Sequence, residues 1–210
     1  MNRTLSEGRF VLNGRPFLIV GAEIHNSGSS TPTAIRRSLE SVATIGANTV
    51  LAPIAWESIE PREGEFDFAL VDALVEIAQR LSLKLIPLWF GTWKNGMSTY
   101  APEWVKLDTD RFPLIRTATG AIPAVSPFST EARDADARAF AKVMRRLREI
   151  DRHDTVLMMQ VENEVGVLGD SRDRNELAAA QWDEPVPATV VNAVRAMERG
   201  RLHRALGSTT

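Results

Sequence analysis

The feature that most constrains the fold is an alternation of short apolar runs with stretches of helical periodicity. Three runs are rich in branched apolar side chains and too short for typical helices: residues 48–54, 83–89 and 155–160. Each run follows a stretch whose apolar residues recur at helical spacing: residues 33–45, 69–81 and 129–150. Strands that alternate with helices form right-handed βαβ units around a parallel sheet. We therefore predict an α/β fold.

The N-terminal segment predicts a β-hairpin that leads into a first core strand. Asn13-Gly14 stands between the apolar runs 10–12 and 17–21, and Asn-Gly in this position is the strongest short-range hairpin signal. The run that ends near Glu164 is then the fourth strand of the βα series. A complete (β/α)8 barrel takes about 250 residues, so a chain of 210 residues with four strands used by residue 164 predicts a partial TIM barrel.

We expect one domain over residues 1–210, built from about the first four βα units. Beyond the fourth strand, residues 170–210 predict a polar loop and a helical tail, with a helix over residues 186–206. The long stretch 91–128 has no regular period and is rich in Gly, Pro, Thr and Trp, which is typical of a functional loop.

Composition narrows the classes of partner. The 25 basic and 27 acidic residues give a net charge of −2, which favours neither nucleic acid nor an anionic membrane surface. The chain has no cysteine, so no thiolate nucleophile or disulfide is available. No signal-peptide h-region and no run of about 18 apolar residues occurs, and we expect a cytoplasmic protein. No acid or histidine cluster has metal-ligand spacing, so neither metal nor cofactor is expected.

The tetrad Val161-Glu162-Asn163-Glu164 is the strongest candidate for chemistry. It closes a buried strand, and side chains at the C-terminal ends of barrel strands point into the active-site mouth. Cleavage of a glycosidic bond needs a carboxyl group there as proton donor. In extended geometry Glu162 and Glu164 share one face, whereas a bulge would separate them; the sequence leaves this open.

Other polar and aromatic residues follow the earlier strands. Glu57 and Glu60 come after the second strand and are candidates for a second carboxylate, or Glu60 anchors its loop by accepting backbone hydrogen bonds. Four aromatic residues on or after the third strand either stack on a sugar ring or fill the core beneath a loop: Trp89, Trp93, Tyr100 and Trp104. Trp56 directly follows the second strand. His25, after the first strand, either binds a sugar hydroxyl or has a structural role.

Three motifs resemble the catalytic barrels of glycoside hydrolase families 35 and 42, the β-galactosidase group. Ala22-Glu23-Ile24-His25 resembles the first-strand motif of family 35. The stretch 55–61 (Ala-Trp-Glu-Ser-Ile-Glu-Pro) resembles the second-strand motif of family 42. The stretch 159–166 (Met-Gln-Val-Glu-Asn-Glu-Val-Gly) is similar to the family 35 sequence that carries the acid/base, and it is the most specific of the three.

The resemblance implies a retaining β-glycoside hydrolase in which Glu164 is the general acid/base and Asn163 binds the sugar 2-hydroxyl. Further substrate contacts are predicted at Glu162, His25, Trp56, Trp93 and Trp104. The family nucleophile lies on a seventh strand, which these 210 residues are too few to reach. The chain departs from family 35 at Thr92, where that family has glutamate, and at Asn26, where it has tyrosine.

Two hypotheses follow. In the first, the chain is the N-terminal half of a β-galactosidase-like barrel, acts on a β-glycoside, and lacks the nucleophile-bearing half. In the second, it is a non-catalytic sugar-binding or assembly module whose open sheet edges pair with a second copy or with a complementing C-terminal fragment.

Overall fold

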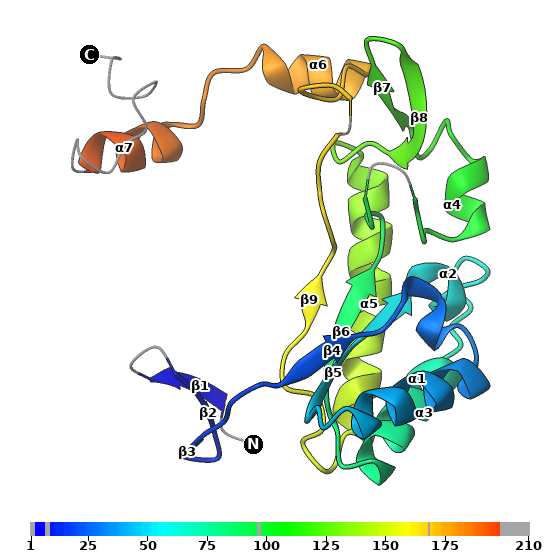
Figure 1. Ribbon diagram of the computed structural model, residues 1–210. Coiled ribbons are helices and arrows are strands. Elements are labelled where there is room, and N and C mark those ends of the chain that lie inside the picture. Colours follow the sequence, from blue (N-terminus) through cyan, green and yellow to red (C-terminus); the bar gives the residue numbers. More distant parts are fainter. Residues whose placement is uncertain (1–2, 7–8, 96–97, 168, 198–210) are drawn as a thin grey trace. The chain divides into compact units, whose positions relative to one another are not determined.

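A computed structural model describes residues 3–6, 9–95, 98–167 and 169–197 (Figure 1). The chain divides into two compact units, residues 1–175 and 176–210, and each is described by itself. The prediction of a single domain over residues 1–210 stays a prediction.

A four-stranded parallel sheet forms the centre of the first unit. Its strands are β4 (Gly21–Glu23), β5 (Thr49–Ala55), β6 (Lys84–Phe90) and β9 (Gln160–Val161), and they lie side by side in chain order. The register pairs Glu23 with Leu51, Ala55 with Phe90, and Trp89 with Val161. This is the order expected for the first four strands of a (β/α) barrel.

The helices that connect consecutive strands begin where the sequence supplies caps. They are α1 (Pro32–Thr44), α3 (Ala69–Arg80) and α5 (Thr130–Ile150), and Figure 1 shows them beside the sheet. The Thr31 hydroxyl accepts a hydrogen bond from the amide of Ala34, and the Ser129 hydroxyl accepts one from Ala132. Their buried faces join the strands in one large core.

The two faces of the sheet have different neighbours because side chains alternate along a strand. On β6, Leu85 and Trp89 point to the face covered by α3 and α5, which we call the helix face. Ile86, Leu88 and Phe90 lie in a second apolar cluster, on what we call the inner face. This alternation assigns each residue that follows β6 to one side of the sheet or the other.

The N-terminal hairpin is confirmed. Strand β2 (Arg9–Leu12) pairs with both β1 (Arg3–Ser6) and β3 (Arg15–Pro16). Its turn places Asn13 and Gly14 at φ values of 52° and 78°, the left-handed conformation that Asn-Gly turns adopt. Apolar residues of this region pack on the inner-face cluster: Phe10, Leu12, Phe17 and Ile19.

The stretch 91–128, predicted as a loop, contains short regular elements. Besides α4 (Glu103–Leu107) it forms an antiparallel hairpin, β7 (Leu114–Thr117) and β8 (Gly120–Val125). Asp173 supports the hairpin, since its Oδ1 accepts a hydrogen bond from the amide of Arg116 at 3.0 Å. The short helices η1 (Asn26–Ser29) and α2 (Trp56–Ile59) follow β4 and β5.

The fourth strand is shorter than the expected one, which extended to about Glu164. Only Gln160 and Val161 form β9, and upstream a single bridge joins Val156 to Leu85. The backbone then enters the left-handed region at Glu162 and Glu164, with φ of 60° and 42°. The strand therefore ends before the residues that carry the candidate chemistry.

The second unit contains α6 (Glu176–Trp182) and α7 (Ala188–Ala196). The helix expected over residues 186–206 thus begins at Ala188, while residues 198–206 lie outside the described residues. Within the described part of the chain, no helix has the length and apolar character needed to cross a bilayer.

Candidate active site

Asp136 is the buried polar centre beneath the candidate site. It lies on α5, and its two oxygens accept three hydrogen bonds: Oδ1 from the indole Nε1 of Trp89 (2.7 Å), and Oδ2 from the backbone amide (2.6 Å) and hydroxyl (2.7 Å) of Thr92. Gly91 makes this approach possible, because a Cβ there would collide with the Asp136 carboxylate and with Nε1 of Trp89. The loop after β6 is thereby fixed to α5.

Glu162 turns toward the same buried group. Its Oε2 accepts a hydrogen bond from the backbone amide of Trp93 at 2.7 Å, and its carboxyl also hydrogen-bonds Asp136. Burial, together with the hydrogen bond and negative charge of Asp136, raises the pKa of Glu162 from 4.5 to about 9, although the amides of Trp93 and Thr92 act in the opposite direction. This raised pKa favours the protonated form of Glu162 at neutral pH.

Asn163 is oriented by two hydrogen bonds. Its Nδ2 donates to the carbonyl oxygen of Lys94 at 2.9 Å, and its Oδ1 accepts from Nε2 of Gln160 at 2.8 Å. With both ends of the amide held, the side chain has a defined direction at the end of β9. Such an amide is suited to hold one hydroxyl of a ligand in a fixed orientation.

Glu164 differs from Glu162 in exposure and partner. Its side chain is 66% exposed, and its Oε2 lies 3.9 Å from Nζ of Lys94. The Lys94 side chain is itself 11% exposed, and its ammonium group lies 5.1 Å from the centre of the Phe90 ring, a cation–π contact. Phe90 belongs to the inner-face cluster, so the Lys94 ammonium and the Glu164 carboxylate associate with that face rather than with the helix face.

A cavity of ≈ 300 Å³ lies beside Glu162 and Asp136. Its charged lining residues are Glu162, Asp136 and Arg133. Trp93, also in the lining, is 4% exposed, and its indole Nε1 has no hydrogen-bond acceptor among the described residues. The indole N–H of Trp93 is thus buried without an acceptor, and its ring packs with Ile115 and Ala124.

Trp56 and Trp104, both predicted as substrate contacts, make hydrogen bonds within this unit. Trp56 is fully buried, and its Nε1 donates to Oε2 of Glu60 at 2.8 Å. Trp104 packs edge-on against Trp56, and its Nε1 donates to the carbonyl oxygen of Glu60 at 3.1 Å. Neither contact leaves Trp56 an open face for a ligand, and sugar contact by Trp104 stays a prediction.

In the structure Glu60 anchors its loop, which is one of the two roles considered for it. Oε1 accepts a hydrogen bond from the amide of Gly64 at 2.8 Å, while Oε2 is engaged by Trp56. Glu57 also has a partner, because its Oε2 lies 2.7 Å from Nζ of Lys106. Both carboxylates after β5 are therefore committed to contacts within this unit.

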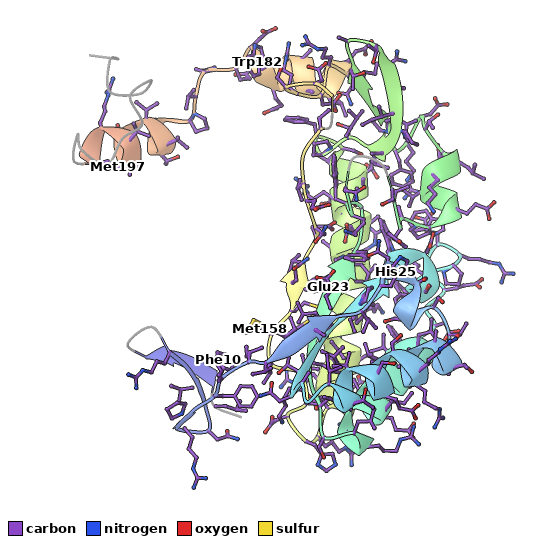
Figure 2. The ribbon with its side chains drawn as sticks, in the orientation of Figure 1. Phe10, Glu23, His25, Met158, Trp182 and Met197 are labelled. Atoms are coloured by element: carbon purple, nitrogen blue, oxygen red, sulfur yellow. The ribbon has the colours of Figure 1, made fainter. Side chains whose placement is uncertain are left out.

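His25 caps the short helix η1. Its Nδ1 lies 2.9 Å from the Ser27 hydroxyl and 3.2 Å from the amide of Ser27. Figure 2 shows Glu23 and His25 at and just beyond the end of β4. This local contact leaves the other ring nitrogen of the exposed His25 for a ligand, and its predicted sugar contact is untested.

Asp136, Lys94 and Gly91 were not singled out from the sequence. A signal for Asp136 exists: the apolar face of α5 runs through Phe140, Val143 and Leu147, and one step of four residues upstream reaches Asp136, an acid at a core-facing position. Among the described residues, no group of three or more acidic or histidine side chains is arranged to hold a metal ion.

Comparison with known proteins agrees with this geometry. The model of the family 42 glycoside hydrolases, the β-galactosidases, matches residues 26–191. The chain is 28% identical over 180 residues to a β-1,2-glucosyltransferase of Ignavibacterium album, a match that covers 78% of this chain and 24% of that protein. It is 35% identical over 97 residues to an exo-β-D-glucosaminidase of Pyrococcus horikoshii, covering 40% and 12% respectively. The chain thus spans about a quarter, or less, of the length of these curated relatives.

Solved structures confirm the fold. The exo-β-1,4-mannosidase Op5Man5 from Opitutaceae bacterium strain TAV5 superimposes with a TM-score of 0.60 at 20% identity, over 80% of this chain and 29% of that chain. GH5_18 from Streptomyces cattleya, solved with GlcNAc, gives a TM-score of 0.50 at 19% identity, over 71% and 34%. The prediction of a partial (β/α)8 barrel is confirmed.

The parallel βα units, with a carboxylate and an amide at the end of the fourth strand, define a barrel of the glycoside hydrolase class. Within that class, the chain belongs to the family 42 glycoside hydrolases, the β-galactosidase family. The likeness of residues 159–166 to family 35 in particular stays a prediction.

Proposed function

We propose that the chain is the part of a retaining, β-galactosidase-like β-glycoside hydrolase that supplies the general acid/base, Glu164. The observation that carries the proposal is the contrast at the end of β9, where Glu162 is buried against α5 and Glu164 is exposed beside Lys94. A group that must reach the glycosidic oxygen has to be accessible at the strand end. Glu164 meets this requirement.

The proposed chemistry needs a second carboxylate. Glu164 protonates the departing oxygen while a nucleophilic carboxylate, about 5 Å away in retaining enzymes, bonds to the anomeric carbon; Glu164 then deprotonates the water that releases the sugar. Glu57 and Glu60 are engaged with Lys106, Trp56 and Gly64. These contacts favour a nucleophile supplied by a further segment of the protein or by a partner copy.

Asn163 is the residue we propose for the sugar 2-hydroxyl. The hydrogen bonds from Gln160 and to Lys94 hold the amide and leave its second N–H for a ligand. Thr92 stands where family 35 has glutamate, and it donates both its hydrogen bonds to Asp136. We therefore propose that sugar recognition around this loop differs from that of family 35.

A panel of nitrophenyl β-glycosides tests the proposal. We expect the purified chain, or the chain mixed with the remaining segment of its protein, to hydrolyse at least one of them, and Glu164→Gln to lower kcat by about 10²-fold or more. Glu40→Gln, an exposed change on α1, serves as the matched control. Equal rates for Glu164→Gln and the unmodified protein would contradict the assignment.

The alternative, a non-catalytic sugar-binding or assembly half-barrel, has its own support. Among the described residues, β4 and β9 each pair with one neighbour, and Val161 and Met158 near the β9 edge are exposed. Sugar binding without turnover, together with self-association in analytical ultracentrifugation, would favour this function. A stable monomer that hydrolyses substrate would exclude it.

A further inference from the structure

The loop after β6 contacts three consecutive residues at the end of β9. The amide of Trp93 binds the Glu162 carboxyl, the carbonyl of Lys94 binds the Asn163 amide, and the ammonium of Lys94 lies beside Glu164. Backbone pairing contributes little here, because β9 ends at Val161. The turn that carries the candidate acid/base is therefore held mainly by side chains.

That turn has an unfavourable backbone. Glu162 and Glu164 both have positive φ, a conformation that costs energy for residues other than glycine and persists only where the surroundings enforce it. Glu162 has the strongest anchoring contacts of the three residues, since its carboxyl binds both Trp93 and Asp136. It is thus the group able to enforce the turn.

The contact between Glu162 and Asp136 requires a proton. Two ionised carboxylates have only acceptor atoms and cannot hydrogen-bond each other. Both oxygens of Asp136 already accept hydrogen bonds from Trp89 and Thr92. A proton on Glu162 would let this side chain donate to Asp136 while Asp136 keeps the hydrogen bonds that it accepts from Trp89 and Thr92.

The surroundings favour this neutral form. Arg133 on α5 is the other charged residue that lines the cavity, and its Nε is paired with Asp134 at 2.8 Å. The loop contributes the backbone and the neutral side chains of Thr92 and Trp93. Lys94 points instead toward Glu164. No cation among these residues neutralises an ionised Glu162.

We propose that Glu162 is a positioning residue: held protonated against Asp136, it fixes the left-handed turn from Glu162 to Glu164 and so orients the acid/base Glu164. The inference rests on the proposed function for the role of Glu164, but not for the state of Glu162. It assigns the two glutamates of the motif opposite tasks, one buried and neutral, the other exposed and reactive.

The closing experiment reads the protonation of Glu162 directly. In a chain labelled with ¹³C-glutamate, the Glu162 carboxyl signal is identified by its absence from Glu162→Gln. We expect this signal to be that of a protonated acid at pH 7 and to shift only near pH 9. A Glu162 signal that is ionised at pH 7 would overturn the proposal.

Two substitutions then test positioning. A glutamine at residue 162 can accept from Trp93 and donate to Asp136 as the protonated acid does, whereas alanine can do neither. We expect Glu162→Ala to speed hydrogen exchange of the Trp93 amide about tenfold or more, and Glu162→Gln to leave it nearly unchanged. Unchanged exchange in Glu162→Ala would also overturn the proposal.

Enzyme turnover provides a test that is independent of the carboxyl titration and the hydrogen exchange. Where turnover is measured, we expect Glu162→Ala to lower kcat about 10²-fold with little change in KM, and Glu162→Gln to restore most of it. Loss of turnover in Glu162→Gln equal to that in Glu162→Ala would count against positioning. If the unmodified protein shows no turnover, the proposed function fails, while the carboxyl titration and hydrogen exchange still decide the state and the anchoring role of Glu162.

Discussion

Strands β5 and β9 belong to the same sheet but are held in different ways. Strand β5 has seven residues, pairs along its whole length with β6, and also pairs with β4. Strand β9 has two residues, pairs with β6 alone in the described structure, and continues into a turn with positive φ. The backbone ladder therefore fixes β5, and side-chain contacts fix the end of β9.

The difference shows where this fold places its chemistry. Regular pairing and a buried core make the centre of the sheet rigid. The carboxylate proposed as the acid/base, Glu164, lies beyond the end of the ladder, where the backbone turns. Anchoring then falls to Asp136, Trp93 and Lys94, which lie on α5 and on the loop after β6. Substitutions in the two regions should differ in the property that they change.

The largest effect on the free energy of unfolding is expected in the buried core of the sheet. Trp89 is fully buried and donates a hydrogen bond to Asp136, so we expect Trp89→Ala to lower the free energy of unfolding by about 3–5 kcal/mol. Val161, on β9, is 59% exposed, and Val161→Ala should change it by less than about 0.5 kcal/mol. Urea denaturation measures the free energy of unfolding of both variants. Similar losses for the two would contradict the difference drawn between the strands.

The second prediction concerns pH. Because the pKa of Glu162 is raised from 4.5 to about 9, the folded chain binds one more proton than the unfolded chain between these values. The contribution of this group is complete below pH 4.5 and is lost as the pH rises to about 9, by at most about 1.4 kcal/mol per pH unit.

Denaturation of the unmodified chain and of Glu162→Gln at a series of pH values checks this prediction. Glutamine does not titrate, so the free energy of unfolding of the variant should rise relative to that of the unmodified chain as the pH increases from 5 toward 9. A constant difference over this range would show that Glu162 is ionised in the folded state.

A substitution at Gly91 tests how closely the loop after β6 approaches α5. We expect Gly91→Ala to lower the free energy of unfolding by about 1–3 kcal/mol, since the added Cβ collides with the Asp136 carboxylate and with Trp89. Gly166 has open space around its Cβ position, which makes Gly166→Ala the matched control. A neutral Gly91→Ala would mean that the loop approaches α5 less closely.

The smallest effect is expected at a helix cap far from the turn. Thr31 caps α1 through its hydroxyl, and Thr31→Ala should cost about 1 kcal/mol without changing hydrogen exchange at Trp93. Thr33→Ala, an exposed change within the first turn of the same helix, should be nearly neutral. Faster exchange at Trp93 in Thr31→Ala would show that the two regions are not independent.

The regular part of the fold was predictable because local and global signals agree. Apolar runs, helical spacing and the caps Thr31 and Ser129 located the parallel strands and their helices to within a few residues. The Asn13-Gly14 turn located the hairpin, because few other dipeptides adopt positive φ at both positions so readily.

The turn at the site was not predictable for the opposite reason. Glutamate at positions 162 and 164 gives no signal for positive φ. The conformation is imposed by partners 26 or more positions away in sequence, at residues 93, 94 and 136. The β7–β8 hairpin was missed because its support comes from Asp170 and Asp173, well beyond it in the chain. Long-range polar contacts leave no periodic signal.

The most direct test of Glu164 as proton donor is the dependence of kcat/KM on the leaving group. A poor leaving group such as an alkyl alcohol needs protonation, whereas dinitrophenolate departs without it. We predict that Glu164→Gln lowers kcat/KM by about 10²-fold or more for an alkyl β-glycoside and far less for a dinitrophenyl β-glycoside. Equal losses for the two substrates would contradict the role of Glu164 as the acid/base.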